Sequence, residues 1–369
     1  MGAKPVGRTQ KSNRSVEPMS NDQTGRLVEI GDIDALVEHV GSLCFEERWD
    51  DVVDLHDRCR TALERGRQLW PAAAYANYRL ALDAPPKWAC SVLGSGSERF
   101  ALGPFSEVVA NRFEWSDLAP HLGRIDTPTI AAIVQERVVR GDDLRADALA
   151  RRTSDVFELP LVRAEWEPES ALVEYRVDRA RFPSPAPVPL RTVAARAARS
   201  ITDPLVTDAL GALVAAWRRA SDAEVMVTAV EGDGIGAITT LTGLSEQAIA
   251  ELPAQVGLAW LLWAAANGGF AGRRRGQAAA RADLWWTMRA IAGLEEDPFD
   301  TVAQSELSEV VEQLRWYTWD ADIPAHGWAV AIGVEDPAEG VAWALRCIDR
   351  TDYGPKPGQT DECNEPADT

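Results

Sequence analysis

Apolar residues recur at intervals of three and four along the first half of the chain, which is the spacing of one helix face. In residues 45–65, one helix face is apolar apart from a histidine, with intervals of four and three: Phe45, Trp49, Val52, His56, Cys59 and Leu63. Gly66 follows at a position where helices commonly end. Shorter segments of the same kind lie at 71–82, 86–92, 104–111, 115–122 and 127–141. The pattern predicts a series of short helices over residues 27–150, similar to an α-solenoid but without a regular repeat.

Between residues 156 and 182 the pattern changes from helical spacing to alternation. Residues 172–177 place their Val, Tyr and Val side chains on one face, and residues 157–162 alternate in the same way. A Glu-Pro-Glu-Ser sequence at 167–170, which is typical of a turn, lies between them. We therefore expect a β-hairpin at the end of the helical series.

The second half of the chain mixes helical and strand patterns. A Gly-rich turn at 231–234 separates two apolar segments, 225–230 and 235–240, and so predicts a second hairpin. Another strand is expected at 328–334. Asp336, with proline next and glutamate three positions on, is typical of a helix N-terminus. Helices are expected at 190–199, 205–220, 245–253, 254–266, 277–292 and 300–317.

Four prolines within residues 183–189 favour an extended spacer, so we place a domain boundary there. Residues 27–182 would form a helical array that ends in a β-hairpin. Residues 190–350 would form an α+β domain, with helices packed on a small, mostly antiparallel sheet. The fold class is therefore mainly α with an α+β second half. The polar segments 1–26 and 351–369 are typical of a disordered arm and a disordered acidic tail.

The charge balance limits the classes of partner. The chain has 57 acidic and 38 basic residues, a formal net charge of −19. This charge repels nucleic-acid phosphates and anionic membrane surfaces, so neither is an expected partner. The longest nearly apolar run, residues 256–266, is too short to cross a bilayer. The N-terminal residues lack the apolar core of a signal peptide and the five cysteines include no CxxC pair, so we expect a cytoplasmic protein.

The most distinctive segment is a loop rich in glycine and arginine, residues 267–276, between two apolar helices. Glycines let a backbone approach a ligand, and adjacent arginines add positive charge, so the loop is a candidate site for a phosphate or carboxylate. It lacks the GxxxxGK[ST] pattern of a P-loop. The alternative is an ordinary interhelical turn whose arginines pair with the many acids of the chain. The candidate residues are Gly268, Gly269, Gly272, Arg273, Arg274 and Arg275.

Other polar combinations favour structural roles. Residues 231–236 have GxGxG-like spacing, but they are expected between two strands rather than at the start of a helix, which argues against a dinucleotide site. Asp320, Asp322 and His326 lie close together in sequence without an HExxH or EF-hand pattern, so we interpret them as solvated loop charges. We predict no catalytic residue, no metal site and no cofactor.

Tryptophans flank the glycine–arginine loop on both sides. Trp260 and Trp263 share a helix face before it, and Trp285 and Trp286 follow it. Indole rings bury large areas and serve equally well in cores and in interfaces. The sequence indicates a core role, with a partner groove as the alternative.

Several segments carry a family resemblance: 99–105, 136–141, 258–294, 314–320 and 334–344. They include the stretch LAWLLWAAANGGFAGRRRG that begins at Leu258. These segments are similar to those of an uncharacterised, conserved actinobacterial protein family, a domain of unknown function. The resemblance covers most of the chain between its tails. It implies no activity, cofactor or catalytic residue, because none is known for that family.

The favoured function is that of a non-enzymatic, cytoplasmic interaction protein. It would bind a protein partner through the helical half and the Trp-rich surfaces, since no catalytic constellation stands out. The first alternative is an enzyme or regulator that binds a small anionic ligand at residues 267–276. The second is an acidic protein that neutralises a basic partner.

Overall fold

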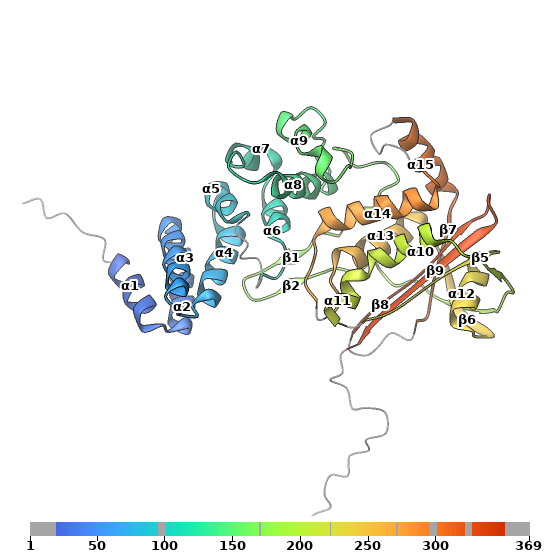
Figure 1. Cartoon of the computed structure of the whole chain (residues 1–369), viewed down its shortest axis with the longest axis horizontal. Coiled ribbons are helices and arrows are strands. Elements are labelled where there is room, and N and C mark those ends of the chain that lie inside the picture. Colours follow the sequence, from blue (N-terminus) through green and yellow to red (C-terminus); the bar gives the residue numbers. More distant parts are fainter. Residues whose placement is uncertain are drawn as a thin grey trace, which may run out of the picture. The chain divides into compact units, whose positions relative to one another are not determined.

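The computed structural model describes residues 20–94, 101–169, 171–221, 223–270, 272–294, 301–321 and 327–350 (Figure 1). The chain divides into two compact units, residues 1–80 and residues 81–369. The described part is mainly helical and the second unit holds an antiparallel sheet, so the predicted fold class is confirmed. None of the described helices is both long enough and apolar enough to cross a membrane.

The predicted division of the chain differs from the two compact units. The prolines of residues 183–189 lie inside the second unit, where they are part of its surface. Residues 20–26, which we expected in a disordered arm, belong to the first helix. Residues 1–19 of that arm, and the acidic tail at 351–369, lie outside the described residues.

Helices build the first unit. The predicted helix at 45–65 begins later, at Trp49, because the chain turns at Glu47, which has a φ of 54°. Phe45 instead ends the preceding helix and is 90% exposed. The face that includes Val52 and Cys59 is buried, as the spacing predicts. The helices are α1 (Ser20–Ile30), α2 (Ile33–Phe45), α3 (Trp49–Glu64) and α4 (Trp70–Asp83), which continues into the second unit.

Short helices also begin the second unit, where the sequence predicts them. Asp126 caps α8, since its side chain accepts a hydrogen bond from the backbone N–H of Thr129 at 3.0 Å. The cap is therefore the residue before Thr127, and Thr127 and Pro128 lie inside the first turn. The elements are α5 (Pro86–Ala89), η1 (Cys90–Val92), α6 (Phe105–Arg112), α7 (Trp115–Leu118), η3 (Ala119–His121), α8 (Thr127–Val139), α9 (Ala148–Arg151) and η4 (Ser154–Val156).

A seven-stranded antiparallel sheet organises the rest of the second unit. Its strand order is β3-β6-β7-β8-β9-β5-β4, and the pairing of β8 with β9 is the longest in register. A separate pair, β1 (Glu174–Tyr175) and β2 (Ala180–Arg181), precedes it. The seven strands are β3 (Arg191–Ala194), β4 (Arg199–Ser200), β5 (Glu224–Glu231), β6 (Glu246–Leu252), β7 (Arg315–Trp319), β8 (Gly327–Asp336) and β9 (Val341–Arg350).

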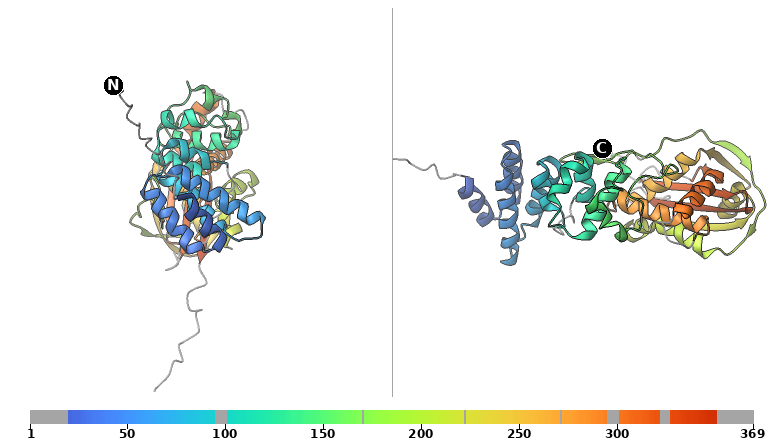
Figure 2. Two further views of the ribbon diagram at one scale, coloured as in Figure 1. Left: turned by 90° about the vertical axis from the view of Figure 1, so that its left-hand side faces the viewer. Right: turned by 90° about the horizontal axis from the view of Figure 1, so that it is seen from above.

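Helices cover both faces of this sheet (Figure 1 and Figure 2). Alternate strand residues belong to different cores: Trp316 and Trp343 face the larger one, and Tyr317 and Ala342 face the smaller one. The smaller core is closed by α12 (Gly234–Thr242). The larger core includes residues of α10 (Pro204–Leu213), α11 (Ala215–Ser221), α13 (Ala254–Ala266), α14 (Gln277–Ile291) and α15 (Thr301–Gln313).

Several predicted elements are wrong in type. Residues 190–199, expected as a helix, supply β3 and β4, and residues 245–253 supply β6 instead of a short helix. Both segments pair with other strands of the sheet, and this pairing overrides their local helical preference. The reverse occurs at 235–240, an expected strand, which lies in α12 because Asp233 caps the helix.

Two predictions near the C-terminus also differ from the structure, because strand pairing determines the elements there. The expected helix at 300–317 ends at Gln313, and the residues after it form β7. The Asp336 side chain does accept backbone hydrogen bonds from Ala338 and Glu339, at 2.9 and 3.2 Å, as a helix cap would. These bonds close the turn between β8 and β9, and no helix follows.

In the first predicted hairpin, residues 157–162 form no strand, and β1 pairs with β2.

Candidate functional site

A cleft of about 670 Å³ opens on the second unit. The extended, proline-rich segment 182–188 forms one wall, and Val256, Ala259 and Trp263 of α13 form another. Arg274, just before α14, lies at its base. The prolines that we expected to link two domains therefore line a cavity.

Acidic residues line one side of the cleft. Glu165 and Glu169 are exposed, whereas Glu167 is buried. Arg163 contributes one positive charge and lies 3.7 Å from Glu169. This side of the cleft therefore presents more negative than positive charge.

A buried arginine fixes the segment that carries these acids. Arg281 of α14 forms two hydrogen bonds to the Glu167 carboxylate, at 2.6 and 2.7 Å. It also donates to the carbonyl oxygens of Pro160 and Val162, at 2.8 and 3.1 Å, and to the Gln135 side chain. One side chain thus ties α8, residues 160–167 and α14 together.

Aromatic rings stiffen the wall that α13 contributes. Trp263 packs against Trp217, Trp260 and Trp328, with ring centroids 5.8, 5.6 and 5.3 Å apart. The Trp217 indole N–H donates to the carbonyl oxygen of Ala264 at 2.9 Å, which holds the cluster on α13. The partner-groove alternative for the tryptophans therefore has a candidate location here, because Trp263 is only partly buried and lines the cleft.

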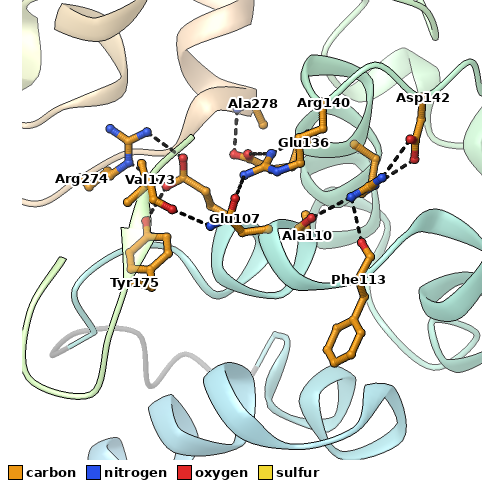
Figure 3. Close-up of polar contacts among 12 residues, drawn as sticks. Glu107, Ala110, Phe113, Glu136, Arg140, Asp142, Val173, Tyr175, Arg274 and Ala278 are labelled. Atoms are coloured by element: carbon orange, nitrogen blue, oxygen red, sulfur yellow. Dashed lines mark hydrogen bonds and ion pairs between the residues drawn. The ribbon is translucent and has the colours of Figure 1, made fainter. Parts of the chain in front are cut away.

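A buried network of charged side chains lies behind Arg274 (Figure 3). The Arg274 guanidinium donates to both oxygens of Glu107 at 2.7 Å and to Asn267 Oδ1 at 2.9 Å. The Tyr175 hydroxyl donates to Glu107 Oε2 at 2.5 Å. Arg274 also lies over the Phe182 ring, 5.1 Å from its centroid. Each of the three guanidinium nitrogens therefore has a partner within the chain, while the residue also lines the cleft.

A second carboxylate of this network caps a helix. Glu136 of α8 accepts hydrogen bonds from Arg140, at 2.7 Å, and from the backbone N–H of Ala278 in the first turn of α14, at 2.9 Å. Gly276 has a φ of 93°, and a Cβ there would lie 2.9 Å from Glu136 Oε1. A glycine is needed at this position both for the backbone angle and for the approach of the carboxylate.

The environments of the two glutamates move their pKa values in opposite directions. Burial, reinforced by the negative charge of Glu107, raises the pKa of Glu136. Burial alone would also raise the pKa of Glu107, but the charge and hydrogen bonds of Arg274 lower it below its usual value. Burial and the neighbouring Glu107 raise the pKa of Tyr175 well above its usual value. Opposite shifts of two neighbouring pKa values are typical of catalytic acid–base pairs. Here, however, both residues are buried, since Glu107 is 0% and Glu136 is 1% exposed.

The side chains of the three candidate arginines of the loop lie in three different environments. Arg274 is buried in the network just described, Arg275 pairs with Asp283 and donates to the Ala265 carbonyl oxygen, and Arg273 is exposed. The structure thus does not bring Arg273, Arg274 and Arg275 onto one cavity. The interhelical-turn interpretation accounts for Arg274 and Arg275, while anion binding by the loop stays a prediction.

The glycines of the loop allow it to fold tightly. A Cβ on Gly268 would strike the backbone of Arg273, and one on Gly272 would strike the Gly268 carbonyl. Gly269 has a φ of 88°, in the region that favours glycine. Close packing within the chain is therefore sufficient to explain these three residues.

The segment with GxGxG-like spacing follows β5 and opens α12, so our premise that it lies between two strands is wrong. Carboxylates already occupy this helix N-terminus. Asp233 accepts from the Gly236 N–H at 2.8 Å, and Glu335 accepts from the Gly234 N–H at 3.0 Å. The Tyr317 hydroxyl donates to the same Glu335 oxygen at 2.8 Å. A negative group would be repelled here.

Of the acidic cluster near residue 320, Asp322 and His326 lie outside the described residues. Over the ranges that the structure describes, no three His, Cys, Asp or Glu side chains are grouped so that they could hold a metal ion. His56 is buried, and its Nδ1 lies 3.0 Å from Asp57 Oδ1.

Sequence reasoning missed Glu107, Glu136 and Glu167. They come from separate segments: Glu136 is already one helical turn from Arg140, but only folding brings Glu107 to Arg274 and Glu167 to Arg281. One signal was present: Gln135, Glu136 and Arg137 interrupt an otherwise apolar stretch of α8, IAAIVQERVV, and charged residues inside such a stretch are commonly paired.

Comparison with known proteins identifies a family but no characterised relative. No curated protein and no solved structure matches the chain. A family model described as a family of unknown function (DUF6183) matches residues 34–349, which include the cleft, the buried network and the sheet. This match confirms the resemblance to a domain of unknown function, and the chain belongs to the DUF6183 family.

Proposed function

We propose that this protein is a non-enzymatic binding protein whose cleft accepts a segment of a partner polypeptide that carries basic residues. One observation carries the proposal: aromatic and proline residues and exposed acids line a single cavity of about 670 Å³. The acid–base groups beneath the cavity are paired with one another.

Binding is favoured over catalysis because of where the ionisable groups lie. A general acid or base must come within hydrogen-bonding distance of its substrate. The carboxylates of Glu107 and Glu136 are buried, and arginines and a helix N-terminus occupy them. Their role is to hold Arg274 and α14 in place beneath the cleft.

The chemistry of the cleft favours a basic polypeptide. Trp263 and the prolines give an extended segment apolar contact area, and interface anchors are enriched in such aromatic residues. Glu165 and Glu169 would attract lysine or arginine side chains, and the net charge of −19 favours encounter with a basic partner. This combines the interaction role that the sequence favours with its acidic-protein alternative.

We also propose that the protein acts in the cytoplasm. Cys59, Cys90 and Cys347 are buried free thiols, which suits a reducing compartment. The helical half is a further candidate contact surface, since it exposes Phe45 and Ile30 at helix ends.

Selection from a random peptide library displayed on phage tests the proposed site. We expect enrichment of sequences that combine lysine or arginine with apolar residues, and loss of their binding in a Glu165→Arg, Glu169→Arg double variant. Glu309→Arg, Glu312→Arg is the matched control, because it makes the same charge change at two exposed positions of α15. Absence of enrichment, or equal binding by both double variants, would contradict the proposal.

A further inference from the structure

A second hollow lies where the glycine–arginine loop meets α11. It has a volume of about 380 Å³ and is lined by Arg219 and Ala220 of α11 and by Gly268, Gly272 and Arg273 of the loop. An adjoining cavity of about 710 Å³ shares Arg219 and is lined further along by Arg218 and by apolar residues that include Ala215, Val225 and Val227. The two hollows thus share a guanidinium at their junction.

The arginines that line these two hollows differ from Arg274 and Arg275, because they have no hydrogen-bond or ion-pair partner among the described residues. Arg218, Arg219 and Arg273 are exposed, and none forms a hydrogen bond or ion pair with another described residue. Two acids lie near these arginines: Asp208 lines the same cavity as Arg218 and Arg219, and Asp283, whose pKa is raised by burial, interacts with the charge of Arg219. Asp283 is already hydrogen-bonded to Arg275. Three arginines without an ion pair to any described residue, spread over two adjoining cavities, are unexpected in a chain with 57 acidic residues.

Gly272 determines how close the loop comes to α11. A Cβ at this position would lie 2.8 Å from the Ala220 Cβ and would also strike the Gly268 carbonyl. Without a side chain, the loop backbone lies against the helix, and the next residue, Arg273, joins Arg219 on the same hollow. A larger residue at 272 would move Arg273 away from it.

We infer that Arg219 and Arg273, with Arg218 beside them, form a binding site for the phosphate group of a small organic phosphomonoester. A phosphate dianion has three oxygens, which suits guanidinium groups that come from two different elements. The apolar surface of Ala215, Val225 and Val227 provides contact area for the attached organic group. This site is separate from the proposed polypeptide cleft, and Arg274 and Arg275, which the sequence grouped with Arg273, take no part in it.

Titration of the full chain with phenyl phosphate, followed by isothermal calorimetry at constant ionic strength, tests this site. We expect saturable binding that weakens by about tenfold or more in an Arg219→Gln, Arg273→Gln double variant, because charge-assisted hydrogen bonds are lost. The matched control is Arg151→Gln, Arg152→Gln, which removes two exposed arginines elsewhere and should bind as the wild type does. All four positions are exposed, so the variants should keep the fold, which circular dichroism can verify.

Three results would overturn the inference: no saturable binding up to about 10 mM phenyl phosphate, unchanged affinity in the Arg219→Gln, Arg273→Gln variant, or equal weakening in the control. Inorganic phosphate should bind more weakly than phenyl phosphate. A higher affinity for inorganic phosphate would contradict a contribution of the apolar surface to binding. The Glu165→Arg, Glu169→Arg variant should bind phenyl phosphate normally, so failure of the polypeptide cleft and failure of this site are distinguishable.

Discussion

Arg274 and Glu107 show how a single residue pair can decide the architecture of the region below the cleft. Both side chains are almost fully buried, and each depends on the other for neutralisation. Two buried charges that face each other offset the cost of leaving water only while both are present. Removal of one partner therefore leaves an uncompensated charge in the interior.

For Glu107→Gln we expect a loss of about 3–5 kcal/mol in the free energy of unfolding at pH 7, because Arg274 would keep its charge without its counter-ion. Urea unfolding followed by circular dichroism measures this loss. Glu114→Gln, on the exposed surface just after α6, makes the same chemical change and should leave the unfolding midpoint where it is. Equal midpoints for the two variants would show that the buried pair contributes nothing.

The opposite pKa directions of the two glutamates predict opposite pH effects. Glu136 has a raised pKa in the folded state, so its contribution to stability is largest at low pH and is lost as the pH rises above 4.5. Glu107 has a lowered pKa, so its contribution is present above 4.5 and is lost as the pH falls through its folded-state value. Replacement of Glu136 by Gln should therefore make the protein relatively more stable as the pH rises.

Urea unfolding of the wild type and of Glu136→Gln across pH 4 to 8 measures this trend. We expect the stability of Glu136→Gln relative to the wild type to increase toward the upper end of the range. Glu107→Gln should show the reverse, with its deficit growing as the pH rises. Parallel curves for all three proteins would contradict the assigned directions.

At the scale of elements, two helices begin against carboxylates supplied by distant parts of the chain. Glu335 of β8 meets the first turn of α12, and Glu136 of α8 meets the first turn of α14. Each carboxylate satisfies a free N–H group and interacts favourably with the positive end of the helix dipole. These contacts fix the start of a helix relative to a strand or helix far away in sequence.

Gly276→Ala should disturb the start of α14. The residue has a φ of 93°, and its added Cβ would lie 2.9 Å from the Glu136 carboxylate, so we expect a loss of about 1–3 kcal/mol in stability. Gly211→Ala is the control, because Gly211 lies within α10 with nothing within 4 Å of its Cβ position. The control should gain up to about 1 kcal/mol from helix propensity, and thermal unfolding compares the two. A neutral Gly276→Ala variant would mean that the carboxylate does not depend on the glycine.

The sequence predicts elements whose signal is local. The helices at 254–266 and 277–292 and the strand at 225–230 were found because their apolar pattern and flanking residues agree. The strands β3 and β6 were not predicted, because these segments are strands only through their pairing with neighbouring strands. The candidate site follows the same division: Arg274 was identified, but Glu107 and Tyr175 lie far from it in sequence, and nothing local indicates that folding brings them together.

At the scale of the whole molecule, charge is the dominant feature. Ion pairs in the interior of the second unit are matched, whereas the chain as a whole carries 19 more negative than positive charges. Repulsion among exposed acids opposes the folded state and is screened by salt, while buried pairs are screened much less. Salt should therefore relieve the repulsion without removing the internal network.

We expect the midpoint of thermal unfolding to rise as NaCl increases from about 20 mM to about 300 mM, because the Debye length shortens over this range. Differential scanning fluorimetry measures the midpoint, and choline chloride at equal ionic strength controls for specific effects of sodium. A midpoint that falls with either salt would indicate that attractive surface pairs, and not repulsion, dominate the charge contribution to stability.

The strand order of the sheet has a consequence for behaviour at high concentration. Its two outermost strands, β3 and β4, have only four and two residues, and each begins with an arginine, Arg191 and Arg199. Long, flat, uncharged borders act as templates on which other chains can add and grow into fibrils. Here β9 pairs with β8 over its whole length and with β5 over all eight residues of that strand, and each outermost strand offers few backbone groups and a charge. We therefore expect the short, charged strands β3 and β4 to be poor templates for sheet-mediated aggregation.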